Sequence, residues 1–166
     1  MKRIWAAWRM KYVGSSTKEN GCIFCNALSK KDDDTNLIAM RGERAFIILN
    51  KFPYTSGHLM VAPITHVATL EDLDAATRAE VMELASFSMT VLRKVYSPQA
   101  FNLGANIGEA AGAGVPGHVH MHIVPRWNGD TNFMTSIGDV RVLPETLKDT
   151  YRRIRECIVL MGASQN

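Results

Sequence analysis

The sequence has few cysteines and no long apolar run, and each absence excludes a class of protein. Three cysteines in 166 residues cannot form the disulfide framework of a small secreted domain. No apolar stretch approaches the roughly 20 residues that span a bilayer. The apolar residues 4–8 are followed by Arg9 and Lys11, too early for a secretory signal. We therefore expect a cytoplasmic protein with no membrane partner.

The distribution of charge disfavours one further class of protein, and the composition excludes another. Lys and Arg number 19 against 16 Asp and Glu, and they form no dense stripe of the kind that binds duplex nucleic acid. The net charge of +3 suits an anionic substrate instead. A hydrophobic share of 46% excludes a disordered chain. The length predicts one domain over residues 1–166, with an amino-terminal extension over residues 1–20.

Hydrophobic patterns predict an α+β fold on a mainly antiparallel sheet. Strands are predicted over residues 36–40, 44–50, 58–63, 100–104 and 118–125. Helical spacing predicts one long helix over residues 71–96, which starts at a capping box over residues 69–72 or at Asp74. A C-terminal helix is predicted over about residues 144–160, and the polar stretch 29–34 is predicted to be a solvated loop. Strands in series around one long helix are typical of the α+β class.

Three histidines alternate along the last predicted strand. Side chains on a strand alternate between faces and rise ~3.3 Å per residue, so His118, His120 and His122 share one face with roughly 6.6 Å between neighbours. Imidazoles make a poor apolar surface, because each buried ring needs a hydrogen-bond partner. A surface strand or a metal-binding strand is the alternative interpretation. The opposite face carries side chains that can pack into a core: Val119, Met121 and Ile123.

A row of imidazoles next to a glycine-rich loop favours phosphoryl chemistry. A neutral imidazole has a lone pair near pH 7 that can attack phosphorus, and its adduct is labile enough to be discharged. Neighbouring histidines can bind phosphate oxygens or protonate the leaving group. Backbone amides of the loop over residues 108–117 can hold the same oxygens.

The sequence resembles the histidine-triad family. Residues 118–124 match the family motif, which is His-x-His-x-His followed by two apolar residues. The resemblance implies that His120 is the catalytic nucleophile, and that His118 and His122 support phosphate binding and proton handling. It also implies a dimer with a long helix. The resemblance covers most of the chain, since it extends to Asn50, residues 57–63, His66, residues 106–108 and residues 125–126. The predicted nucleotide-binding residues are Asn50, His58, Asn106, Gly112 and Gly114.

Residues 5–12 and 125–134 are similar to the diadenosine polyphosphate phosphorylases and to the fragile-histidine-triad branch. This implies cleavage of a dinucleoside polyphosphate through a nucleotidyl-histidine intermediate, which water or phosphate then discharges. Mg²⁺ is expected to accompany the polyphosphate. The chain departs from the common pattern over residues 112–117, where the family's hydroxyl donor is missing. The uridylyltransferase branch is disfavoured because Val119 and His122 replace its proline and glutamine.

Cys22 and Cys25 form a Cys-x-x-Cys pair, which indicates metal or redox chemistry in a chain without export signals. A reduced, partly buried pair and a redox motif are the alternatives. Zinc needs two further ligands beside the two thiolates. The family resemblance implies that these are His66 and His118, and thus a structural zinc site.

Three other functions stay open from the sequence. The chain can be a nucleotide-binding module with little turnover, an adenosine phosphoramidate hydrolase with a different small substrate, or a zinc-dependent nucleic-acid binder. The absence of a basic stripe disfavours the last.

Overall fold

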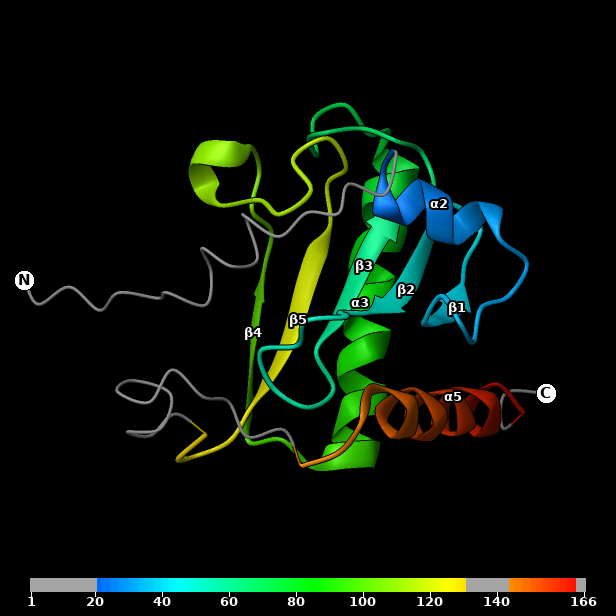
Figure 1. Ribbon diagram of the computed structural model, residues 1–166, viewed down its shortest axis with the longest axis vertical. Helices are drawn as coiled ribbons and strands as arrows, with labels where there is room; N and C mark the ends of the chain where they lie inside the picture. The colour runs from blue at the N-terminus through cyan, green and yellow to red at the C-terminus, as the bar shows by residue number, and fades with distance from the viewer. Residues whose placement is uncertain (1–20, 131–143, 164–166) are drawn as a thin grey trace, which may run out of the picture.

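A five-stranded antiparallel sheet forms the centre of the protein (Figure 1). The computed structural model describes residues 21–130 and 144–163. The predicted extension over residues 1–20 and the family-like residues 131–134 lie outside this part. The strands occur in the order β1-β2-β3-β5-β4, which confirms the α+β prediction. They are β1 (Ile38–Arg41), β2 (Ala45–Leu49), β3 (Leu59–Pro63), β4 (Ala100–Gly104) and β5 (Met121–Arg126).

The long helix α3 (Ala75–Tyr96) covers one face of the sheet and builds the main core with it. Of the two predicted starts the structure has Asp74, whose side chain accepts a hydrogen bond of 2.6 Å from the backbone N–H of Thr77. The helix ends where Ser97 takes a left-handed conformation, with φ of 48°. The C-terminal helix α5 (Leu147–Ala163) packs against α3 and β1, three residues later than predicted at each end. None of the described helices is long and apolar enough to cross a bilayer.

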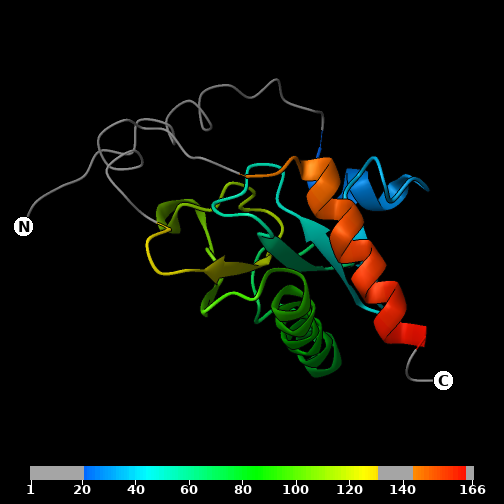
Figure 2. The ribbon, with the colours of Figure 1, turned by 90° about the horizontal axis from the view of Figure 1, so that it is seen from below.

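A short helix, α2 (Ile23–Ser29), covers part of the opposite face (Figure 2). The buried Phe24 and Ala27 pack there against side chains of the first three strands, chiefly Phe46, Ile48 and Met60. This helix was not predicted, because seven residues are too few to show a helical period. Helix α2 packs on the first three strands, so residues 21–130 and 144–163 leave the β5 and β4 half of this face open beside the histidines.

The strand ladder of β5 begins at Met121, not at His118 as predicted. His118 and Val119 are instead held by backbone bonds from His118 N–H to the Val115 carbonyl (3.3 Å) and from Val119 N–H to the Val67 carbonyl (2.8 Å). The first two triad histidines therefore precede the ladder. Within it, His122 lies between Met60 of β3 and Gly104 of β4, on the face that α2 partly covers.

Candidate active site and metal centre

His120 is held with one ring nitrogen directed away from the backbone. Its Nδ1 lies 2.9 Å from the His118 carbonyl oxygen, which can only accept, so Nδ1 carries the proton. In the neutral ring, Nε2 then carries the lone pair. Burial lowers the pKa of His120 below the usual histidine value, and this keeps the ring neutral at pH 7. The ring also packs against Phe24, with the centroids 4.9 Å apart.

A chain of hydrogen bonds fixes the proton of His122. The backbone N–H of Tyr54 donates to Nδ1 of the buried His58 over 3.1 Å. In neutral His58 the proton is therefore on Nε2, which lies 3.0 Å from His122 Nδ1 and donates to it. This leaves neutral His122 with an N–H at Nε2. Burial and, to a lesser extent, the electrostatic effect of the His120 ring lower the pKa of His122 to about 4.

Asn50 supports the same chain from the end of β2. Its Nδ2 lies 3.3 Å from His58 Nδ1, and its Oδ1 accepts from the backbone N–H of Phe52 over 2.9 Å. The structure thus brings together the predicted Asn50, His58, His120 and His122. Tyr54 was not predicted, yet its ring stacks on His122 with centroids 6.1 Å apart and planes 22° apart. Its position in a turn of Pro, Ser and Gly residues gave no chemical signal.

His118 is engaged on both ring nitrogens and has no exposed surface. Its Nε2 donates to the Pro63 carbonyl over 2.8 Å. Its Nδ1 lies 3.3 Å from Cys22 Sγ and 3.7 Å from Cys25 Sγ. Neither nitrogen is left for a phosphate oxygen. The geometry gives His118 a positioning role, different from the phosphate contact that the family resemblance implies.

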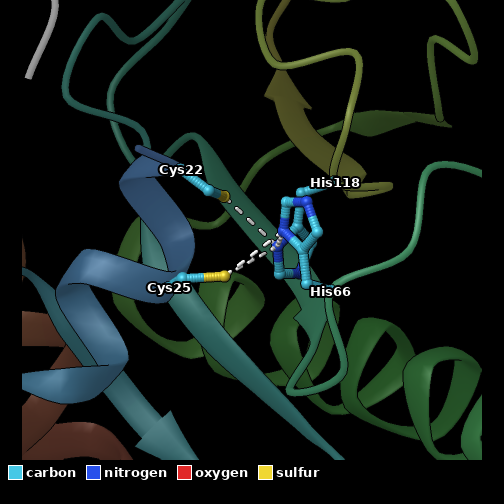
Figure 3. A group of neighbouring side chains, drawn as sticks. All are labelled: Cys22, Cys25, His66 and His118. Atoms are coloured by element: carbon cyan, nitrogen blue, oxygen red, sulfur yellow. Dashed lines mark hydrogen bonds between the residues drawn. The ribbon is translucent and has the colours of Figure 1, made fainter. Parts of the chain in front are cut away.

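The four predicted metal-ligating residues converge (Figure 3). The thiols of Cys22, the residue before α2, and of Cys25 in α2 point toward the rings of His66 and His118. Cys25 Sγ to His66 Nδ1 and His66 Nδ1 to His118 Nδ1 are both 3.3 Å, and all four ligand atoms lie within 4.8 Å of one another.

This cluster has the donor set and dimensions of a tetrahedral zinc site. With Zn–S bonds of about 2.3 Å and Zn–N bonds of about 2.0 Å, neighbouring ligands lie roughly 3.3–3.8 Å apart. The sulfur–nitrogen distances of 3.3–3.7 Å and the nitrogen–nitrogen distance of 3.3 Å fall in that range. Burial, followed by the nearby Cys22 thiol, raises the pKa of Cys25. A cation would reverse this effect, because it favours the thiolate. The residues therefore fit a metal ion.

A cleft of about 810 Å³ opens beside His122. The predicted Asn106 lines it, together with Gly104. Gly112 and Gly114 are exposed and do not line it. Two lining residues that were not among the predicted sites are Asn102 of β4 and Val124 of β5. The alternation that placed His122 on the open face was also the signal for them.

Comparisons with known proteins agree with this arrangement. The HIT domain matches residues 31–129. The AP-4-A phosphorylase of Mycobacterium tuberculosis is 36% identical over 159 residues, which are 92% of this chain and 82% of that protein. The bis(5'-nucleosyl)-tetraphosphatase (asymmetrical) of Schizosaccharomyces pombe is 37% identical over 82 residues, which are 49% of this chain and 44% of that protein. A zinc-bound histidine triad family protein from Mycobacterium smegmatis superposes with a TM-score of 0.70 at 27% identity, covering 87% of this chain and 97% of that one.

Proposed function

Because this chain belongs to the HIT family, we propose that it is a nucleotidyl-transfer enzyme that cleaves dinucleoside polyphosphates, such as diadenosine tetraphosphate, through His120. The observation that carries the proposal is the bond from His120 Nδ1 to the His118 carbonyl. It leaves the Nε2 lone pair for the substrate without the need for a separate general base.

The proposed reaction has two steps. Nε2 of His120 attacks the α-phosphorus, the bond from phosphorus to the bridging oxygen breaks, and the leaving nucleotide takes the electron pair. The Nε2–H of His122 donates to a phosphate oxygen as charge develops. In the second step an acceptor oxygen displaces His120 and restores the free ring.

Inorganic phosphate is the acceptor that we favour over water. The relative named a phosphorylase covers nearly the whole chain, whereas the relative named a tetraphosphatase covers about half. Phosphate as acceptor releases a nucleoside diphosphate from the intermediate, and water releases a monophosphate. Omitting phosphate from the assay distinguishes the two: a phosphorylase loses turnover and a hydrolase keeps it.

Intact mass of the enzyme quenched during turnover tests the intermediate. A single nucleotidyl adduct that maps to His120 is expected, and none in the His120→Ala variant. Cleavage by the variant at the wild-type rate, or an adduct on another residue, would remove His120 as the nucleophile.

We also propose that Cys22, Cys25, His66 and His118 hold a structural zinc ion. Zinc would supply a fixed cross-link between α2 and the segment before β5, with no part in bond breaking. Elemental analysis of the purified protein should give one zinc per chain. The family resemblance further predicts a homodimer, which light scattering tests.

A further inference from the structure

The cleft beside His122 extends well beyond the triad. Along β5 the side chains of His122, Val124 and Arg126 share one face, so the open face continues roughly 13 Å past His122. Near its start, a Cβ added to Gly104 would meet no atom within 4 Å, so the space beside His122 is open. A volume of about 810 Å³ is larger than the reacting phosphate needs and lies in the usual range for small-molecule sites.

The far end of the cleft is electrically balanced. Arg126 donates to both carboxylate oxygens of Asp130 over 2.6 and 2.8 Å, and to the side-chain oxygen of Asn102 over 2.7 Å. Arg153 donates to Glu145 over 2.9 Å. Among the described residues that line the cleft, the charged side chains besides His122 are two cations, each paired with a carboxylate. A surface built for phosphates would carry an excess of positive charge.

Aromatic rings and fixed polar groups characterise this end of the cleft. Tyr96 and Trp127 line it, and the Arg153 guanidinium lies 4.7 Å from the centre of the Tyr96 ring. Tyr96 O–H donates to Glu145, and Thr150 donates to the same carboxylate over 2.9 Å. The side chains of Asp130 and Glu145 are only 12% and 14% exposed, which holds their oxygens in place. Aromatic faces suit a heterocyclic base, and carboxylates suit sugar hydroxyls or base amino groups.

We infer that this far end, around Arg126, Trp127 and Arg153, binds the second nucleoside of the substrate, the one on the leaving side of the cleaved bond. The inference rests on the proposed function and adds a requirement to it. The enzyme recognises both ends of a dinucleoside polyphosphate, so the distal nucleoside contributes to affinity and not only the phosphates.

Two ligands that differ only in the second nucleoside test this. One is diadenosine tetraphosphate, and the other is adenosine tetraphosphate with a methyl ester on its terminal phosphate, which has the same phosphates and the same charge. Calorimetric titration of the His120→Ala protein measures both without cleavage. We expect diadenosine tetraphosphate to bind about tenfold tighter, a difference of about 1.4 kcal/mol.

Variants locate the effect. Arg153→Met should reduce the tenfold ratio to within about twofold, by weakening only the diadenosine ligand. Arg152→Met removes the same charge from the adjacent, exposed position of α5 and should leave the ratio unchanged. Asn102→Ala, at an exposed position on the β4 side of the cleft, should also reduce the ratio; thermal melting checks that each variant is folded.

The outcomes separate the two proposals. Equal affinities for the two ligands would overturn the nucleoside site. The proposed function would still hold if the wild-type enzyme cleaves diadenosine tetraphosphate. Equal effects of Arg153→Met and Arg152→Met would also overturn it, because they would indicate a general charge effect. Failure of the wild-type enzyme to cleave diadenosine tetraphosphate would refute the proposed function itself.

Discussion

His118 and His122 lie two residues to either side of His120, but their rings have different surroundings. At the His118 end, both ring nitrogens are used within the protein, by the Pro63 carbonyl and by the Cys–His cluster. At the His122 end, Nδ1 accepts a hydrogen bond from the His58 N–H, and the ring lines the cleft. The same side chain at a regular spacing is therefore bound within the protein at one end and lines the cleft at the other.

His120 depends on both ends. Its Nδ1–H donates to the backbone carbonyl of His118, so the fixed end orients the proposed nucleophile through the main chain. The ring centroids of His120 and His122 are 4.8 Å apart, so His120 is also in contact with the open end. Changes at the first end should therefore affect the fold together with activity, and changes at the second end should affect activity more than the fold.

Loss of the proposed metal centre should have the largest effect on stability. Cys25→Ser removes one ligand, and with it the cross-link from α2 to His118, so the free energy of unfolding should fall by about 4 kcal/mol or more. Cys157→Ser is the matched control, because Cys157 lies in α5 away from the cluster. Denaturant unfolding with zinc analysis of each variant provides the measurement. Equal stability of the two variants would show that the cluster carries no structural metal.

Replacing rings at the two ends should sharpen the contrast. His58→Phe keeps the ring shape but removes the donor to His122 and the acceptor for Tyr54 N–H, so kcat should fall about a hundredfold and stability by about 1–3 kcal/mol. His66→Cys gives a Cys₃His set, which also binds zinc, so metal content and kcat should stay near wild type. If His66→Cys lost as much activity as His58→Phe, the hypothesis that the His118 end is structural and the His122 end acts on substrate would be wrong.

Much of this arrangement could be predicted from the sequence because it follows from periodicity. The alternation of residues 118–123 placed His122 on the open face and Ile123 in the core, and the strand over residues 100–104 has its predicted bounds. The Cys-x-x-Cys spacing, together with the family resemblance, brought His66 and His118 into one cluster.

The remainder depends on contacts that no local pattern encodes. Helix α2 is too short for a period and is held by the burial of Phe24 against β2. The engagement of His118 comes from Pro63, 55 positions away, and the tautomer of His122 comes from a backbone amide in a turn. Such partners become visible only when the chain has folded, so the sequence alone did not show the bond from His118 to Pro63.

Acid should destabilise the open end. The pKa of His122 is about 4 in the folded protein, compared with about 6.5 in an unfolded chain. Below pH 6.5 the unfolded chain takes up the proton first, so stability falls as the pH drops toward 4, by about 3 kcal/mol at most. Unfolding at pH 7, 5.5 and 4.5 measures this, and His122→Asn should show a smaller decline. An unchanged decline would assign the effect to other groups.

Two glycines near opposite ends of the row should give the smallest effect. Gly104 faces the cleft beside His122, where an added methyl group meets no atom within 4 Å. A methyl group added to Gly117 would lie 3.7 Å from Nε2 of the His66 ring. Neither has a positive φ, so an alanine at either position should change stability by less than about 1 kcal/mol.

Gly104→Ala puts its methyl group where the polyphosphate would lie, so KM should rise a few-fold with kcat nearly unchanged. Gly117→Ala should alter neither constant, because its methyl group lies on the metal side. A rise in KM for Gly117→Ala but not for Gly104→Ala would place the substrate at the other end of the row and reverse the assignment of the two histidines.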